Sequence, residues 1–191
     1  MPLMKNIGAN GEPAVFLDRD GTVSEEVGYM YDVSLYRVFP WTGEAIRRIN
    51  QSGMKVILAT NQSGIDRGYF TESMVNKVHN RLRDEISKAK AKLDGVYFCP
   101  HHPEAGCKCR KPNPGMLRRA ERELGVDLQR SYMVGDRYLD VRTGKAAGAF
   151  AVLVLTGDGQ EEYELHKNDD IQPDFVADNL AEAVDCILGD R

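Results

Sequence analysis

The sequence lacks an excess of positive charge, a long apolar run, and an apolar block near its first residue. Its 25 Lys and Arg stand against 29 Asp and Glu, and the formal charge of -4 gives no reason to expect nucleic acid as a partner. No apolar run approaches the roughly 20 residues that span a bilayer. Residues 1–11 also lack the apolar block of a secretory signal. We therefore expect a monomer in the cytoplasm that binds neither nucleic acid nor a membrane.

Cysteine is scarce as well, with four residues in the chain, but three of them lie close together in the sequence. These are Cys99, Cys107 and Cys109. Thiols stay reduced in the cytoplasm. A cluster of thiols in a reducing compartment favours a metal site over disulfide bonds.

Short apolar runs alternate along the chain with segments of helical periodicity. The length of 191 residues suits one domain with a sizeable core, and we expect a single domain over residues 1–191. The runs that resemble strands are Ala14–Leu17, Lys55–Ala59, Gly95–Phe98, Ser131–Val134 and Phe150–Leu155. Such alternation predicts an α/β fold, a Rossmann-like parallel sheet in three layers with helices on both faces.

Helix signals fall between and after these runs. Asn113 followed by a proline predicts a helix start, and Gly125 predicts the end of that helix. The acidic stretch 157–170 is expected to be a solvated surface segment. The expected helices are Thr42–Gln51, one with Thr71 as its N-cap, one from Asn113 to Gly125, one over about Tyr138–Ala147, and Asn179–Leu188.

The connections between the first strands are short. About thirty residues separate Val23 from Lys55, and a loop and one helix account for most of them. A loop and one helix likewise account for the stretch from Ser63 to Leu93. An inserted lid domain with its own core typically needs about 50 residues or more. We therefore expect an open site without a cap domain, in which loops hold the substrate.

Two carboxylates, Asp18 and Asp20, directly follow the first apolar run. The carboxyl ends of parallel strands border the crevice where ligands bind. Two like charges repel each other there, and a cation would relieve the repulsion. The alternative is a solvated turn, because Asp and Gly are favoured in turns. We interpret Asp18 as a nucleophile, Asp20 as its acid/base partner, and the pair as half of a magnesium site.

Later strand ends are polar too. The second run leads into Thr60-Asn-Gln-Ser63, whose hydroxyls, amides and backbone N–H groups suit phosphate oxygens, although such loops are often ordinary turns. The fourth run leads into Asp136, a candidate metal ligand or a helix N-cap. Arg110 and Lys111 precede a proline that fixes the backbone direction. Together these groups supply what phosphoryl transfer requires: a nucleophile, a divalent-ion site and positive charge around the phosphate oxygens.

Four segments resemble, in order, the signature motifs of the haloacid dehalogenase superfamily. They are Asp18-Arg-Asp20-Gly-Thr22-Val23, Thr60-Asn61, Lys111 and Gly135-Asp136-Arg137-Tyr-Leu-Asp140. The aspartate at position 20 resembles the phosphatase members. The resemblance implies that Asp18 forms an aspartyl phosphate and that Asp20 protonates the leaving oxygen and then activates water. It also implies that Asp18, the backbone carbonyl of Asp20, and Asp136 hold Mg²⁺, while Thr60 and Lys111 stabilise the phosphoryl group. Arg19 is given no role and is expected at the surface.

The cysteine cluster contains histidines as well. Cys99, His101, Cys107 and Cys109 form a Cys-x-His…Cys-x-Cys arrangement, and His102 competes with His101 for the ligand role. Thiolates and an imidazole suit tetrahedral Zn²⁺, and four protein ligands leave no open position for catalysis. We predict a structural zinc site in a loop at residues 99–109, which orders the loop that carries Lys111.

Within the superfamily, a zinc loop of this type resembles two lidless groups, the heptose 1,7-bisphosphate phosphatases and the histidinol-phosphate phosphatases. The run Asn61-Gln-Ser-Gly-Ile-Asp-Arg67-Gly68 resembles the heptose group, whereas the short spacing between His101 and Cys107 is more like the histidinol group. We favour removal of the C7 phosphate of D-glycero-D-manno-heptose 1,7-bisphosphate, a step in the synthesis of nucleotide-activated heptose for lipopolysaccharide core or surface glycans. Histidinol phosphate is the alternative substrate.

The same resemblance implies which residues contact the sugar or its phosphates. Two further guanidiniums beside Lys111 permit a second phosphate, because arginine binds phosphate in a bidentate manner. The implied contact residues are Glu26, Val27, Gly28, Tyr29, Thr60, Asn61, Gln62, Ser63, Arg110, Lys111 and Arg137.

Overall fold

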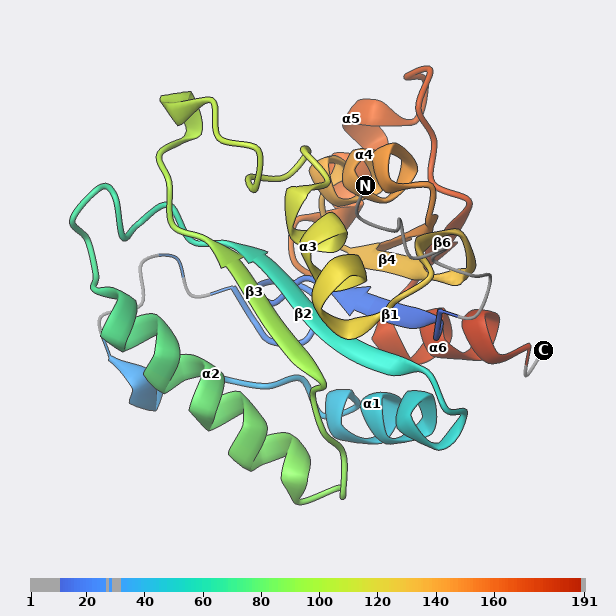
Figure 1. Ribbon diagram of the computed structural model, residues 1–191, viewed down its shortest axis with the longest axis horizontal. Helices are drawn as coiled ribbons and strands as arrows, with labels where there is room; N and C mark the ends of the chain where they lie inside the picture. Colours follow the sequence, from blue (N-terminus) through green and yellow to red (C-terminus); the bar gives the residue numbers. More distant parts are fainter. Residues whose placement is uncertain (1–10, 27, 29–31, 190–191) are drawn as a thin grey trace, which may run out of the picture.

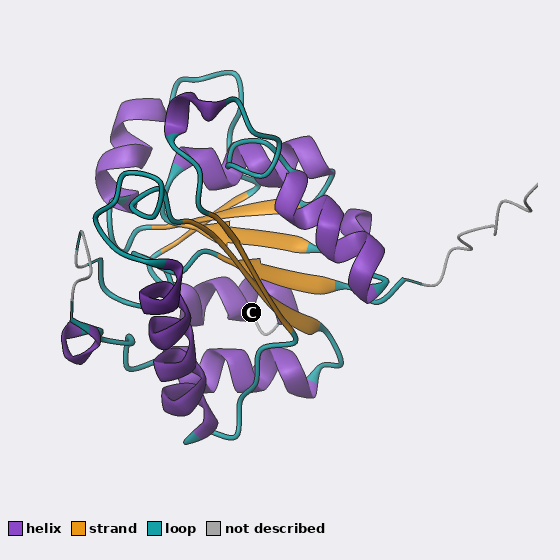
Figure 2. Ribbon diagram, turned by 60° about the vertical axis from the view of Figure 1, so that its left-hand side comes forward, coloured by secondary structure: helices purple, strands orange, loops and turns teal. Residues whose placement is uncertain are grey.

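The computed structural model describes residues 11–26, 28 and 32–189, which form a parallel sheet with helices on both faces (Figures 1 and 2). The six strands lie in the order β3-β2-β1-β4-β5-β6, and every pairing between neighbours is parallel. The strands are β1 (Ala14–Leu17), β2 (Lys55–Asn61), β3 (Gly95–Cys99), β4 (Tyr132–Gly135), β5 (Phe150–Val154) and β6 (Phe175–Ala177). The α/β fold predicted from the sequence is confirmed.

Alternate residues of the central strands face opposite helical layers, because successive side chains of a strand point to opposite faces. Val15 and Leu17 of β1 pack into the layer of α1 (Thr42–Gln51), α2 (Glu72–Ser87) and α6 (Leu180–Leu188). Ala14 and Phe16 pack into the opposite layer, which contains α3 (Gly115–Leu124). On that same face, α4 (Tyr138–Ala147) and α5 (Gly159–His166) lie next to each other (Figure 1), and both contact β5. All four side chains of β1 are 0% exposed, which explains its continuous apolar sequence.

The strand order reverses between β1 and β4. From β1 the chain proceeds outward to β2 and β3, then crosses back to place β4 against the other side of β1. At such a switch point the connections leave in opposite directions and open a crevice at the carboxyl ends of the strands. The residues that follow β1 and β4 are therefore brought to one place.

The described connections contain only short elements. Between β1 and β2 they form the 3-10 helix η1 (Val33–Leu35) and α1, and between β2 and β3 they form α2. Two further 3-10 helices are η2 (Pro103–Ala105) and η3 (Leu128–Arg130). In residues 11–26, 28 and 32–189 there is no inserted cap domain. Of the helices in this described part, none has the length and apolar character that crossing a membrane requires.

Two elements were not predicted, and both lie near the far edge of the sheet. β6 has three residues, too few for a recognisable apolar run. The stretch 157–170, expected to be a solvated surface segment, contains α5, whose only buried residue is Gly159. The acidic composition of this stretch concealed a short helix, of which Tyr163 packs against the core and Glu162 bonds to the backbone of Tyr138.

One predicted helix start was wrong. The helix expected to have Asn113 as its N-cap and Pro114 as its first residue begins at Gly115 with Pro114 as its N-cap, and Gly125 ends it as predicted. The Asn113 side chain is used elsewhere: its Nδ2 donates a hydrogen bond to the carbonyl of Cys107 at 3.0 Å. Asparagine side chains bond readily to nearby backbone groups, so the same residue type can cap a helix or fasten a loop.

Candidate active site

The residues predicted for phosphoryl transfer converge at the carboxyl ends of β1, β2 and β4. Asp18 follows β1, Thr60 lies at the end of β2, and Lys111 enters from the loop after β3. The ammonium nitrogen of Lys111 lies 2.9 Å from Asp18 Oδ1. A cavity of about 140 Å³ opens here, lined by Asp18, Asp20, Glu26, Thr60, Asn61, Ser63, Arg110, Lys111, Arg137 and Leu139.

Three buried carboxylates gather beside this cavity. Asp18, Asp136 and Asp140 each place an oxygen within 4.8 Å of the others. Burial, followed by the charges of Asp18 and Asp140, raises the pKa of Asp136 to about 8. Three carboxylates with one ammonium leave negative charge uncompensated, which suits a divalent cation with oxygen ligands.

Asp140 was not among the predicted site residues. It is 0% exposed, and its Oδ1 lies 2.6 Å from Lys111 Nζ. Its Oδ2 accepts a hydrogen bond from the backbone N–H of Arg137 at the start of α4. The sequence carried a signal, because Asp140 stands four residues after Asp136, a spacing that brings two side chains to one side of a helix start.

Lys111 is held from two sides. Although burial opposes its charge, Asp140 and then Asp18 raise the pKa of its ammonium. Its backbone N–H donates to Asn61 Oδ1 at 3.1 Å, and its carbonyl accepts from Asn61 Nδ2 at 3.2 Å. Asn61, predicted as a substrate contact, therefore also fixes the loop that carries the lysine.

Arg19 was expected at the surface, and this was wrong. Its side chain is 4% exposed, with Nε 2.9 Å from Asp20 Oδ1 and Nη2 2.7 Å from Asp20 Oδ2. Although burial opposes the charge, Asp20 raises the pKa of Arg19. The two carboxylate oxygens of Asp20 match the planar fork of the guanidinium, which is why the Arg19 side chain can be buried. The apolar pattern of β1 does not predict that Arg19, which follows it, pairs with Asp20.

Gln62 lies beneath the cavity rather than in its lining. It is 4% exposed. Its Nε2 donates to Asp20 Oδ2 at 3.1 Å and to Thr60 Oγ1 at 2.9 Å, and its Oε1 accepts from Arg19 at 3.0 Å. These bonds let Gln62 hold Asp20 and Thr60 in place.

Asp136 is enclosed by backbone. Its Oδ2 accepts the backbone N–H of Asp158 at 3.0 Å, and Thr22 Oγ1 lies 3.3 Å from its Oδ1. A Cβ at Gly21 would fall 2.0 Å from Asp136 Oδ2, and Gly21 has a φ of +76°. Glycine is therefore required at position 21 both by the space and by the backbone conformation.

Charged side chains surround the outer part of the cavity. Glu26 lines it, and burial and then Asp158 raise the pKa of this carboxyl. Arg110 lines it with a buried Nη1 that has no hydrogen-bond partner among the described residues. Gly28 is exposed, whereas the predicted contacts Val27 and Tyr29 lie outside the described residues.

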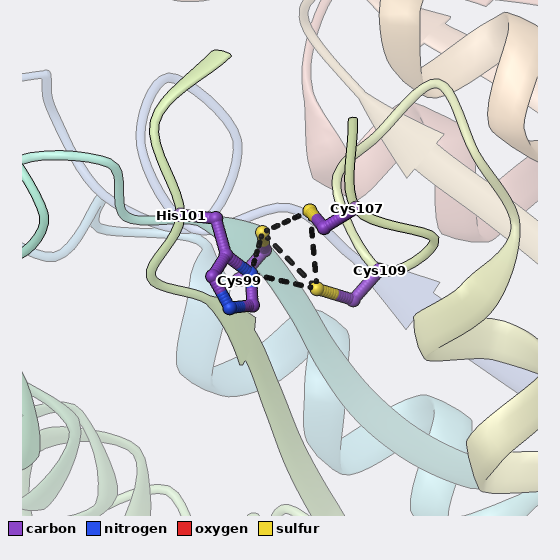
Figure 3. A group of neighbouring side chains, drawn as sticks. All are labelled: Cys99, His101, Cys107 and Cys109. Atoms are coloured by element: carbon purple, nitrogen blue, oxygen red, sulfur yellow. Dashed lines mark hydrogen bonds between the residues drawn. The ribbon is translucent and has the colours of Figure 1, made fainter. Parts of the chain in front are cut away.

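A second cluster lies at the end of β3. Figure 3 shows the sulfurs of Cys99, Cys107 and Cys109 with Nδ1 of His101. Cys99 Sγ and His101 Nδ1 each lie 3.3 Å from Cys109 Sγ, and Cys107 Sγ lies 3.5 Å from the other two sulfurs. A disulfide needs about 2.05 Å, so these thiols are close but not bonded. Four soft donors around one point could hold a tetrahedral metal ion.

His102 points elsewhere. Its backbone N–H donates to Asp66 Oδ2 at 2.8 Å, and its ring Nδ1 accepts from the backbone N–H of Glu104 at 3.3 Å. It therefore caps η2, and His101 is the histidine that the structure brings to the thiols.

Comparisons with known proteins agree with this geometry. A family model described as HAD-hydrolase-like matches residues 108–183. D-glycero-D-manno-heptose-1,7-bisphosphate 7-phosphatase of Thermosynechococcus vestitus is 41% identical over 186 residues, covering 92% of this chain and 95% of that relative. The D-glycero-beta-D-manno-heptose-1,7-bisphosphate 7-phosphatase of Yersinia pestis is 42% identical over 153 residues, 76% of this chain and 81% of the relative.

A solved structure is similar over nearly the whole chain. It is D,D-heptose 1,7-bisphosphate phosphatase from B. bronchiseptica, complexed with magnesium and phosphate. The TM-score is 0.85 at 32% identity, with 94% of this chain and 99% of that one covered.

Proposed function

Because the chain belongs to the heptose-1,7-bisphosphate 7-phosphatase family of haloacid dehalogenase-like hydrolases, we propose that it removes the C7 phosphate of D-glycero-D-manno-heptose 1,7-bisphosphate. The relatives favour this substrate over histidinol phosphate. We place the reaction in the synthesis of nucleotide-activated heptose for lipopolysaccharide core or surface glycans. We also propose that residues 1–191 form one domain and that the protein is a monomer. We place it in the cytoplasm, since a reducing compartment keeps the clustered thiols from forming disulfide bonds.

The convergence of Asp18, Lys111 and Asp136 at the sheet's switch point carries this proposal. Asp18 attacks phosphorus, the bond from phosphorus to the C7 oxygen breaks, and an aspartyl phosphate forms. Thr60 and Lys111 stabilise the charge on the phosphoryl oxygens during this transfer.

Asp20 handles the protons. It gives a proton to the departing C7 oxygen and then takes one from the water that attacks the aspartyl phosphate, which releases phosphate and restores Asp18. Arg19 and Gln62 fix the direction of the Asp20 carboxylate.

Asp18, the backbone carbonyl of Asp20, and Asp136 are the ligands we assign to Mg²⁺. The uncompensated charge of the three buried carboxylates fits a divalent ion. The solved relative from B. bronchiseptica is complexed with magnesium and phosphate. When bound, Mg²⁺ supplies positive charge next to the phosphoryl oxygens.

The rest of the cavity lining is assigned to the sugar and its second phosphate. The contact residues we propose are Glu26, Val27, Gly28, Tyr29, Thr60, Asn61, Gln62, Ser63, Arg110, Lys111 and Arg137. Arg110 Nη1 is buried and has no hydrogen-bond partner in the part of the chain that the structure describes, which supports a phosphate contact there, because such a donor is costly unless a ligand satisfies it.

Cys99, His101, Cys107 and Cys109 are proposed to hold a structural Zn²⁺. Cys109 stands two residues before Lys111, and Asn113 bonds back to the carbonyl of Cys107. The metal would thus order the segment that delivers the lysine.

Phosphate release from heptose 1,7-bisphosphate and from histidinol phosphate, each with Mg²⁺, tests the proposed substrate. We expect strong preference for the bisphosphate, with ³¹P NMR showing that the phosphate at C1 is retained. Preference for histidinol phosphate would overturn the heptose proposal and leave the phosphatase chemistry standing.

The Asp18→Asn variant tests the chemistry. It should lower turnover by about ten thousandfold or more. Circular dichroism should show an unchanged fold, because Lys111 keeps its ion pair with Asp140. Normal turnover in this variant would exclude Asp18 as the nucleophile.

A further inference from the structure

Arg137 faces two carboxylates of the α5 segment. It lies between β4 and α4, and its side chain lines the cavity while remaining 46% exposed. Its Nη2 lies 3.3 Å from Asp158 Oδ2, and its Nε lies 3.9 Å from Glu162 Oε1.

Asp158 and Glu162 each make a hydrogen bond to a residue of the site or of α4. The second oxygen of Glu162, Oε2, accepts the backbone N–H of Tyr138, the first residue of α4, at 2.7 Å. The backbone N–H of Asp158 donates to Asp136 Oδ2. Figure 1 shows α5 next to α4. The Glu162 carboxylate and the Asp158 backbone are therefore anchored next to Arg137, unlike charges on a free surface helix.

We propose that Asp158 and Glu162 are positioning residues that hold the Arg137 guanidinium at the rim of the cavity, where its remaining N–H groups bind the phosphate that is not cleaved. A guanidinium has five N–H donors in a rigid fork. The ion pairs with Asp158 and Glu162 hold the guanidinium near these two acids and leave donors for a ligand. This inference rests on the proposed function, since it concerns the second phosphate of a bisphosphate.

The direction of the change in KM distinguishes a positioning role of the two acids from simple repulsion of the substrate by their charge. A carboxylate near the cavity repels an anionic substrate, so its removal would by charge alone lower the KM. If the acids position Arg137, their removal raises the KM instead, because the arginine must be ordered during binding.

The test uses Asp158→Asn and Glu162→Gln, singly and together. The glutamine keeps an oxygen for the Tyr138 N–H, and the Asp158 backbone N–H is unchanged, so folding is preserved. We expect the KM for heptose 1,7-bisphosphate to rise about three- to tenfold in the double variant, with kcat changed less than about twofold. The KM for p-nitrophenyl phosphate, which has one phosphoryl group, should stay within about twofold of the wild-type value.

Two controls sharpen the result. Glu161→Gln removes an exposed carboxylate from the same helix, and it should leave both KM values unchanged. In an Arg137→Met background, Asp158→Asn and Glu162→Gln should no longer raise the KM, because the group they position is gone.

The possible outcomes distinguish a failure of the positioning role from a failure of the proposed function. A wild-type chain that hydrolyses p-nitrophenyl phosphate but not the bisphosphate overturns the proposed function. An active bisphosphatase overturns the positioning role if its KM falls or stays unchanged in the double variant, or if it rises equally for both substrates.

Discussion

At the scale of single residues, the site depends on two glycines, because a side chain at either position would collide with a carboxylate of the site. Gly21 and Gly157 approach Asp136 so closely that a Cβ at either would meet its carboxylate within 2.3 Å. Both have positive φ angles, +76° and +56°. The Asp-x-Asp-Gly pattern therefore specifies more than two acids, because its glycine lets the third carboxylate enter.

Gly21→Ala should impair the site, and Gly148→Ala provides the matched control. Both glycines have positive φ, so each alanine should cost about 1–2 kcal/mol of unfolding free energy. No described atom lies within 4 Å of a Cβ at Gly148, whereas Gly21→Ala displaces Asp136. Only Gly21→Ala should raise the Mg²⁺ concentration needed for half-maximal activity. Equal Mg²⁺ requirements in both variants would contradict this account.

The sequence predicted the reacting residues better than the residues that hold them. Asp18, Thr60, Lys111 and Asp136 follow strands, and strand ends of a parallel sheet meet at one edge. The partners of Asp20 could not be found this way. Whether Arg19 turns outward or folds back onto its neighbour depends on Gln62, which arrives from β2. Spacing along one segment does not contain that information.

At the scale of elements, α2 contains a buried histidine, His79, whose protonated form is disfavoured in the folded chain. His79 is 2% exposed and lies beside Phe98, with ring centroids 5.8 Å apart. Burial, followed by the charge of Arg19, lowers its pKa to about 3. The unfolded chain gains a proton at His79 below about pH 6.5, while the folded chain stays neutral there until about pH 3.

Stability should therefore fall as the pH drops from about 6.5 towards 3, and His79→Leu should remove this part of the fall. The slope is at most about 1.4 kcal/mol per pH unit, so between pH 7 and pH 5 the wild type should lose about 2 kcal/mol more than the variant. Urea unfolding at the two pH values measures the difference. Parallel losses in wild type and variant would show that His79 does not carry the effect.

The loop that joins the thiol cluster to Lys111 is a second element with a testable role. Cys107→Ser should reduce bound zinc from about one ion per chain to a substoichiometric amount, because one of four ligands is lost. It should also weaken phosphate binding, since the loop that orders Lys111 loosens. Elemental analysis gives the zinc content, and Cys186→Ser, which alters a thiol outside the cluster, should leave it unchanged. Full zinc content in Cys107→Ser would rule out the ligand assignment.

At this scale the elements missed by sequence analysis share one cause. β6 and α5 lie at or near the sheet edge, where little apolar surface is buried and periodicity is weak. β1 and α1 were predicted with the bounds the structure gives, because a fully buried strand and an amphipathic helix impose their pattern on the sequence. α5 instead contacts the site through Asp158, before its first turn, and Glu162, which sequence alone presents as ordinary surface acids.

At the scale of the whole molecule, Asp18 after β1, Asp136 after β4 and Asp140 of α4 repel one another at the carboxyl edge of the sheet. Mg²⁺ should therefore stabilise the entire fold. At about one hundred times its dissociation constant, a bound ion adds about 2.7 kcal/mol, which raises the Tm of a chain this size by about 5–10 °C. Thermal melts with and without Mg²⁺ measure the shift. The Asp136→Asn variant should show little of it, and an equal shift in that variant would place the ion elsewhere.

The lack of a cap domain in the described part of the chain bears on where the phosphoryl group can go. The side chains of Asp18 and Asp20 stay 10% and 26% exposed, so bulk solvent can follow the departing sugar alcohol into the cavity. A phosphotransferase must shelter its acyl phosphate until a second organic acceptor arrives. This architecture favours immediate capture by water, and we expect inorganic phosphate as the product even when competing alcohols are abundant.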